Sequence, residues 1–393
     1  MSQHYSTQSF FRKAPNALLQ RYFSKEGVLT DFEFDKLKEG NPKPLFDAWL
    51  ELPVEKRNTM DGAFQDIFRL SCEKGFNAIK DEAKWHLEEG FEEFILKMSG
   101  LKNHCERAFI TFLDHSGYWP GALMFYHADT LSSWRKRKNI PKVAAKCDDA
   151  NLWDLARQIK EYFNSTEGRG RNCVVEALRR KDKDYFFAYP EDYSQHSIEW
   201  VEGEFQPRPH NPAFEIIFVY TQSEGTLDLH FKGNMKAKEA LQYYFVETIL
   251  GELELQPEED DERVYDLNPL RNREFSFQYD PESGIQSVKV KRMRLSSKLR
   301  KGDRITLEAD IKETDKAVYD LLDNLAESVS VDMYNVTRVE LVASIDRGGD
   351  KKPKNELFSV TFPNSCSLKY DDMGLKLRAM LEASGIEPKE EDK

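Results

Sequence analysis

The sequence predicts an α+β protein, with a helical N-terminal domain followed by a mixed α+β region built from ββα units. In the first 165 residues, apolar side chains recur at intervals of three and four, which is typical of amphipathic helices. Beyond residue 171 the pattern changes to alternation, which is typical of strands. Aromatic residues make up 12% of the 393 residues, and disordered chains contain few of them, so we expect two or three folded domains.

The helical domain is predicted to cover residues 1–165. Its periodic segments are residues 16–23, 63–70, 91–98, 104–113 and 152–163. Pro53, Pro120 and Pro141 lie between or beside these segments, where proline favours a helix boundary. Residues 164–171 contain two glycines and several small polar residues, so we predict a loop and a domain boundary there.

An α+β domain is predicted for residues 172–250, a linker for residues 251–274, and a C-terminal α+β domain for residues 275–393. Strands are expected at residues 185–189 and 198–205, and a hairpin at 214–220 and 226–231, followed by a helix at 235–250. The pattern of two strands and a helix then recurs twice. Its elements are strands 288–295 and 304–311 with helix 316–327, and strands 336–345 and 357–362 with helix 373–383. We expect the charged end, residues 387–393, to be frayed.

Charge is unevenly distributed along a chain whose net charge is −12. Residues 134–146 contain six basic residues and no acid, and residues 288–304 contain eight basic residues and one acid. Between them, residues 252–262 contain seven acids. Such blocks indicate either solvated faces or sites for charged partners, and the acidic run 252–262 is a candidate docking site for a basic protein partner.

The cysteines and the apolar runs indicate a cytoplasmic protein. The five cysteines are scattered without Cys-x-x-Cys spacing, which favours reduced thiols over a disulfide framework or a zinc site. The N-terminus contains no apolar segment of a secretory signal, and no apolar run approaches the roughly 18 residues that a membrane span requires. We therefore expect no membrane association.

Residues 129–141 read DTLSSWRKRKNIP. This segment resembles the recognition helix and following turn of the helix-turn-helix domains of CI-type phage repressors, in which a Ser-x-Trp-x-x-Arg-x-x-Ile-Pro run recurs. The resemblance implies that Leu131 and Trp134 are buried anchors and that the neighbouring polar residues contact DNA. Phe125 stands where the family usually has the glycine of its tight turn. The candidate nucleic-acid-binding residues of this segment are Ser132, Ser133, Arg135, Lys136, Arg137 and Lys138.

The second basic block favours a hairpin that follows a phosphate backbone. In the strand expected at 288–295, alternation places Lys289 and Lys291 on one face and Arg292 and Arg294 on the other. Lys and Arg in a strand also protect a sheet edge from aggregation, which is the alternative interpretation. The candidate nucleic-acid-binding residues of this hairpin are Lys289, Lys291, Arg292, Arg294, Lys298 and Arg300.

Catalytic signals are few. The order of elements over residues 235–345, with a strand at 275–279, resembles the core of PD-(D/E)xK nucleases, and Asp310 and Lys312 would share one face of the third strand. Asp303 lies roughly 23 Å from Asp310 along an extended strand, so the two cannot bind one metal ion. Glu82, His86, Glu89 and Glu93 can share a helical face, either as metal ligands or as a solvated acidic surface. No phosphate-loop, dinucleotide, nucleophile-elbow or kinase motif is present, and we predict no cofactor.

The leading hypothesis is a non-enzymatic cytoplasmic protein of bacterial type that binds DNA or RNA through its basic patches. The first alternative is a protein-interaction subunit of a larger complex, whose interface would use the charge blocks and the aromatic strand at residues 185–189. The second alternative is a metal-dependent nuclease or an inactivated relative of the PD-(D/E)xK enzymes.

Overall fold

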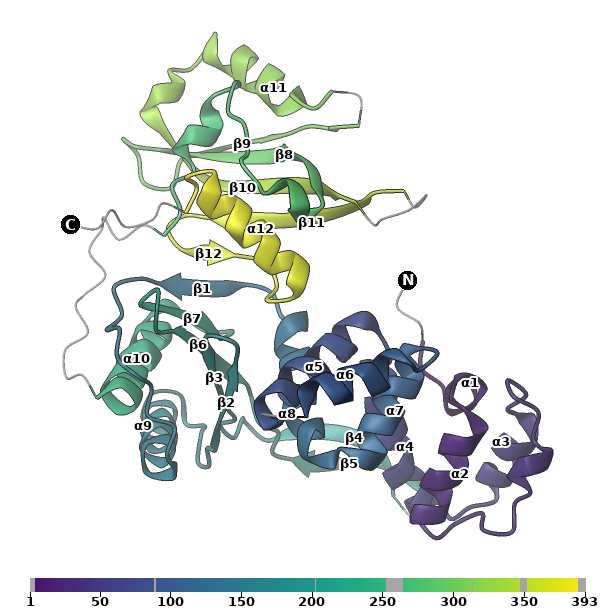
Figure 1. Cartoon of the computed structure of the whole chain (residues 1–393). Helices are drawn as coiled ribbons and strands as arrows, with labels where there is room; N and C mark the ends of the chain where they lie inside the picture. Colours follow the sequence, from purple (N-terminus) through teal and green to yellow (C-terminus); the bar gives the residue numbers. More distant parts are fainter. Residues whose placement is uncertain are drawn as a thin grey trace. The chain divides into compact units, whose positions relative to one another are not determined.

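The structure is a computed structural model that describes residues 4–87, 90–201, 203–251, 264–312, 314–346 and 352–387. The chain divides into two compact units, Met1–Thr130 (unit 1) and Leu131–Lys393 (unit 2). Among the described residues, unit 1 contains helices and no strand, whereas unit 2 combines helices with antiparallel sheets (Figure 1). The predicted α+β class is confirmed.

Unit 1 encloses a cluster of buried aromatic rings. Phe64 lies among them, with its ring centroid 4.9 Å from that of Phe10 and 5.5 Å from that of Phe11. The predicted helices at 16–23, 63–70, 91–98 and 104–113 are confirmed. The helices are α1 (Thr7–Lys13), α2 (Asn16–Lys25), α3 (Lys43–Leu50), α4 (Val54–Leu70), α5 (Glu73–His86), α6 (Phe91–Ser99), α7 (His104–Asp114) and α8 (Trp119–Thr130).

Unit 2 is built on a ten-stranded antiparallel sheet with the order β2-β3-β6-β7-β1-β12-β11-β10-β8-β9. Its strands are β1 (Trp134–Arg137), β2 (Val175–Arg180), β3 (Lys183–Ala188), β6 (Ile216–Thr221), β7 (Thr226–His230), β8 (Ile285–Ser297), β9 (Arg304–Glu308), β10 (Tyr334–Ile345), β11 (Lys354–Thr361) and β12 (Ser365–Cys366). The helices are α9 (Asp149–Glu167), α10 (Met235–Phe245), which continues as a π-helical turn at Val246–Leu250, α11 (Ala317–Ala326) and α12 (Asp372–Ala383).

Strand β1 joins the two halves of this sheet. It pairs with β7 along one edge and with β12 along the other, so Arg135 lies opposite both Leu229 and Ser365. The helices of the two halves cover opposite faces. Arg137 of β1 points to Gln242 of α10, whereas the ring of Trp134 lies 4.9 Å from that of Tyr370, which precedes α12. Because Trp134 and Arg137 lie three residues apart in a strand, their side chains point to opposite faces of the sheet.

Most of the predicted strands and helices of unit 2 are confirmed. The hairpin at 214–220 and 226–231 is β6 and β7, and Gly225 in its turn has a φ of +63°, which favours glycine. The ββα pattern appears as β6-β7-α10, as β8-β9-α11 and as β10-β11-α12 with the short β12 added. The strands predicted at 288–295 and 336–345 fall within β8 and β10, and the strand predicted at 357–362 overlaps β11, which ends at Thr361.

Some expected elements differ from the structure. The strand expected at 198–205 is a separate hairpin, β4 (Gln195–Val201) and β5 (Glu204–His210), because Gly203 adopts a φ of +85° and turns the chain. Residues 275–279 form no strand, and β9 ends at Glu308 rather than at residue 311.

The expected domain limits also differ from the two units. Helix α9 was predicted to close the helical domain, yet its Leu155, Ile159 and Phe163 pack in the core of unit 2. In the predicted linker 251–274, the described residues from 264 onward supply Val264 and Tyr265 to the core beneath β8 and β10. The regions 172–250 and 275–393 share one continuous sheet through β1, so they belong to a single unit.

Candidate nucleic-acid interface

The expectation that residues 129–141 form a recognition helix is wrong. Helix α8 ends at Thr130, and Trp134–Arg137 form strand β1. Both backbone edges of β1 are paired with other strands. This pairing gives its N–H and C=O groups the hydrogen-bond partners that a helix would otherwise provide. Ser133 and Asn139, on either side of the strand, adopt φ values of +70° and +58°, which are incompatible with a continuous helix.

The cations of this segment lie inside unit 2. Arg135, Lys136 and Arg137 are only 8%, 8% and 5% exposed. Arg135 donates to Asn364 Oδ1 at 2.7 Å, Lys136 to Glu387 Oε1 at 2.8 Å and Arg137 to Gln242 Oε1 at 3.3 Å. Ser132 and Ser133 are exposed, and Lys138 is half-buried at a cavity. The buried cations therefore stabilise the junction of the two half-sheets instead of forming an exposed surface.

Three of the predicted hairpin cations have carboxylate neighbours. Arg292 contacts Glu308 at 2.6 Å and Glu340 at 2.7 Å. Lys291 lies 3.7 Å from Glu308, and Lys289 lies 2.5 Å from Asp315. Alternation along residues 288–295 did not reveal these partners, because the carboxylates come from β9, β10 and the segment before α11. The charge of this part of β8 is thus largely balanced within the fold.

Toward the turn of the same hairpin, three arginines gather without such balance. Arg294 of β8 lies directly opposite Arg338 of β10, and Arg304 of β9 pairs with Ser296, two residues further along β8. Burial and repulsion from Arg304 and Arg338 lower the pKa of Arg294. We call these three residues the arginine face. The nearest carboxylate to Arg338 is Glu340 at 3.5 Å, and Glu340 also contacts Arg292.

A β-bulge places Arg338 in this cluster. Val336 pairs with Leu295 and Arg338 with Arg294, so Thr337 is an extra residue in β10. Regular alternation would put Arg338 on the same side as the buried Val336, and the bulge turns it to the other side. Thr337 Oγ1 accepts a hydrogen bond from Arg294 Nε at 3.2 Å and lies 2.7 Å from Ser296 Oγ. Sequence reasoning missed Arg338, because no local pattern predicts a bulge there.

The turn between β8 and β9 adds exposed cations. Lys298, Arg300 and Lys301 are exposed, and in the described part of the chain no carboxylate lies within ion-pairing distance of them or of Arg304. The backbone of the turn is ordered by Ser297, whose Oγ accepts hydrogen bonds from the N–H groups of Leu299 and Arg300 at 3.2 and 3.1 Å. Asp303 is the one acid of the turn. The arginine face and the exposed cations of this turn thus lie at the same end of the hairpin.

The other side of the same strands is apolar and covered. Met293, Leu295, Val339 and Leu341 are buried with residues of α11 and α12. Figure 1 shows α12 crossing this half of the sheet. Because side chains alternate between faces, the arginine face lies on the side of the sheet away from α11 and α12. On that side Arg304 is exposed, whereas Arg294 and Arg338 are half-buried.

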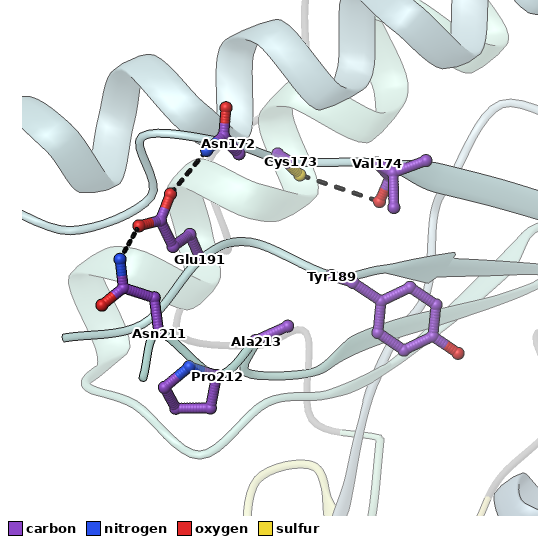
Figure 2. Close-up of a pocket in the computed structure, with 8 residues that line it drawn as sticks. All are labelled: Asn172, Cys173, Val174, Tyr189, Glu191, Asn211, Pro212 and Ala213. Carbon is purple, nitrogen blue, oxygen red and sulfur yellow. Dashed lines mark hydrogen bonds between the residues drawn. The ribbon is translucent and has the colours of Figure 1, made fainter. Parts of the chain in front are cut away.

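The pocket drawn in Figure 2 lies between the start of β2 and the chain that leads to β6, and its volume is about 440 Å³. Its carboxylate, Glu191, accepts hydrogen bonds from Asn172 Nδ2 at 2.7 Å and Asn211 Nδ2 at 2.9 Å, and it also pairs with Arg171. Burial raises the pKa of the Cys173 thiol to about 12, so it is protonated at neutral pH and a poor nucleophile. The pocket therefore holds polar groups that already have partners.

The residues considered for metal chemistry do not assemble a site in the described part of the chain, where no group of three His, Cys, Asp or Glu side chains is placed to hold an ion. Asp310 and Lys312 follow the end of β9 and are exposed. Glu82 is buried and contacts His86 Nε2 at 3.0 Å, whereas Glu93 is exposed. Glu89 lies outside the described residues, as does the acidic run 252–262.

No helix of the described residues is long and apolar enough to cross a membrane. Neither the protein-family models nor the curated protein sequences give a match to this chain.

Proposed function

We propose that this protein binds nucleic acid through the phosphate backbone, using the end of the β8–β9 hairpin. The observation that carries the proposal is the arginine face, where Arg294, Arg304 and Arg338 lie together with a single, shared carboxylate nearby. Like charges in directly opposed positions destabilise a sheet, so a polyanionic partner explains why the cluster persists. The proposed contacts are Arg294, Lys298, Arg300, Lys301, Arg304 and Arg338.

The shape of this surface suits nucleic acid better than a small anion. The cations are spread over three adjacent strands, β9, β8 and β10, and over the β8–β9 turn, instead of converging on one point. Cations spread in this way can meet successive phosphates of a nucleic-acid backbone. The hydroxyl groups of Ser296 and Thr337 lie beside the arginines and add neutral donors of the kind that contact phosphate oxygens.

The remaining charge of the chain favours a localised interface. The net charge is −12, so binding is limited to surfaces where cations gather. The cysteines are all free, which supports a location in the reducing cytoplasm. We propose a binding protein instead of a nuclease, because Asp310 and Lys312 are exposed beyond the end of β9 and no group of three potential metal ligands is placed there among the described residues.

Fluorescence anisotropy with labelled duplex DNA, single-stranded DNA and RNA tests the proposal. Six phosphate contacts predict a loss of affinity on the order of a thousandfold between about 50 and 200 mM salt. The variant Arg304→Glu should weaken binding by about tenfold, because it reverses one exposed phosphate contact. The matched control is Lys376→Glu, which makes the same charge change at an exposed position of α12 on the other side of the sheet. Equal affinities of the two variants would overturn the proposal.

A second candidate function is protein–protein interaction through the β4–β5 hairpin. Trp200 and Phe205 face each other across its strands and are 74% and 64% exposed, and Ile198 lies next to them on the same face. The aromatic strand at residues 185–189 does not offer such a surface, because Tyr185, Phe186 and Phe187 are buried. A specific protein that co-purifies with the native chain, and is lost from the double variant W200S/F205S, would support this function.

A further inference from the structure

Unit 2 contains a cavity of about 520 Å³ between β1, the turns that precede β3 and β7, and α12. Its volume lies in the range of roughly 300–1,000 Å³ that is typical of small-molecule sites. Lys136 lines it from β1, on the face of the sheet that α12 covers. The arginine face lies on the opposite side of the sheet, so the cavity is a separate feature.

The floor of the cavity contains two buried cations. Lys136 and Arg378 are 8% and 7% exposed, and Arg378 stacks on Tyr370 with its guanidinium carbon 4.4 Å from the ring centroid. Arg378 Nη2 donates to the carbonyl oxygen of Leu368 at 2.9 Å. Its Nε and Nη1 have no hydrogen-bond partner in the described structure. A guanidinium carries five donors and stays charged, so two of its buried nitrogens lack an acceptor among the described residues.

The walls add further positive charge. Lys142 and Lys183 line the cavity, and Lys183 donates to Thr221 Oγ1 at 2.8 Å. The stem of Lys142 packs over Gly225, where a Cβ atom would lie 3.1 Å from Lys142 Cγ and Cε. In the described part of the chain, Lys142 has no carboxylate within ion-pairing distance. The same Cβ atom would lie 2.7 Å from the backbone oxygen of Ile140, so glycine at position 225 leaves room for both this oxygen and the stem of Lys142.

One oxyanion already occupies part of this site. Glu387, just beyond α12, accepts a hydrogen bond from Lys136 Nζ at 2.8 Å, and both side chains are 10% exposed. Burial alone would lower the pKa of Lys136, but its attraction to Asp228 and Glu387 outweighs burial and raises that pKa. Lys136 is therefore charged at neutral pH. Glu387 shows that a carboxylate group fits against it.

We propose that the cavity binds a small molecule bearing a phosphate or carboxylate group, which contacts Lys136, Lys142 and Arg378 and displaces the carboxylate of Glu387. The walls also contain acids, Asp182, Glu224 and Glu382, and Glu224 accepts from Thr226 Oγ1 at 3.1 Å. These groups accept hydrogen bonds from hydroxyl or amino groups on the rest of the ligand. The ligand is thus a polar metabolite with one strongly anionic end.

Isothermal titration calorimetry with inorganic phosphate, adenosine monophosphate and succinate tests the inference and separates the phosphate source from the carboxylate source. Lys142→Glu should weaken the binding of the best probe by about tenfold, because it replaces a charge-assisted contact by repulsion. Glu387→Gln should tighten binding by about tenfold, because it removes the competing carboxylate. Both positions leave Arg378 and the core intact. Lys376→Glu, on the outer surface of α12, is the matched control.

The variant Arg304→Glu shows which site is being measured. If the probes bind at the cavity, Arg304→Glu leaves their affinity unchanged, whereas the same variant weakens the binding of nucleic acid. Absence of binding by all three probes to both the native chain and Glu387→Gln would overturn the inference. Binding that Lys142→Glu leaves unchanged would also overturn it, because the anion would then lie elsewhere. Neither result affects the test of nucleic-acid binding.

Discussion

Arg294 on β8 and Arg338 on β10 occupy directly paired positions, so two guanidinium groups lie next to each other on the side of the sheet away from α11 and α12. A bulge at Thr337 produces this pairing, and Arg304 on β9 adds a third charge beside it. Elsewhere on the same strands the cations have carboxylate partners, as Arg292 has in Glu308 and Glu340. The contrast between the two parts of one strand locates the candidate interface.

Replacing Arg338 by threonine should make the isolated protein more stable. The change removes one member of a like-charge pair, and such pairs alter the free energy of unfolding by about 0.2–1 kcal/mol. Urea unfolding at low salt measures it, and the gain should shrink as salt screens the repulsion. Arg292→Thr is the control and should lower stability, since Arg292 is paired with carboxylates. If Arg338→Thr lowers stability as much as Arg292→Thr, Arg294 and Arg338 do not repel each other enough to destabilise the fold.

The salt dependence of nucleic-acid binding should show whether each cation of the turn contacts a phosphate. Arg300→Ala and Lys301→Ala should each reduce the slope of log K against log salt by about one, because each removes one phosphate contact. Anisotropy titrations over a range of salt concentrations give the slope. Lys376→Ala should leave it unchanged. Slopes that match the native value in both turn variants would exclude the turn from the interface.

Lys136 and Glu387 should be strongly coupled. Lys136→Met leaves the carboxylate of Glu387 buried without the cation that pairs with it, and the loss of one partner of a buried pair costs about 3–5 kcal/mol. The double variant K136M/E387Q should lose less stability than the sum of the losses of the two single variants, because the second change removes a buried charge that has no partner. Chemical unfolding of the four proteins gives the coupling energy. Additive losses would show that the two side chains do not interact.

Glu82 should give unit 1 a pH-dependent stability. Burial raises the pKa of Glu82 above its ordinary value of 4.5, and the hydrogen bond from His86 offsets this only in part. A raised pKa means that the contribution of Glu82 is fully present below pH 4.5 and is lost as the pH rises through the raised pKa. Glu82→Gln should therefore gain stability relative to the native chain as the pH increases from 4.5 toward neutrality. Unfolding curves at several pH values test this, and a constant difference would contradict it.

The same carboxylate explains a glycine in α8. A Cβ atom at Gly121 would lie 2.2 Å from Glu82 Oε1, closer than any real contact. Gly121→Ala should destabilise unit 1, even though alanine favours a helix more than glycine does. The double variant G121A/E82A should recover stability, because the obstructing carboxylate is gone. Thermal unfolding of the native chain and the two variants tests this. If the double variant is no more stable than Gly121→Ala, the loss of stability comes from the helix and not from contact with Glu82.

Part of the candidate interface could be predicted from the sequence. Arg294, Lys298 and Arg300 were expected to form a basic hairpin, and they lie on or beside its turn. Arg292 and Lys289 were expected there too, but residues distant in sequence neutralise them. Arg338 could not be found, because a bulge between strands depends on how β10 pairs and not on its own composition.

The sequence by itself determined the elements whose signals are local. The hairpin of β6 and β7 follows from two apolar stretches separated by a turn that contains Gly225. Helix α10 begins where Asn234 caps it by accepting a hydrogen bond from the backbone N–H of Ala237 at 2.9 Å. These signals act between near neighbours and do not depend on the rest of the chain.

Only the tertiary structure decided the roles of the charged segments. Residues 134–137 resemble a recognition helix, but pairing with β7 and with β12, more than 200 residues further along the chain, makes them a central strand with buried cations. The same long-range pairing brings Arg294, Arg304 and Arg338 together. The sequence gives the positions of the charged residues. Whether each charge is buried, paired or exposed depends on contacts between distant residues, and these contacts form only when the sheet forms.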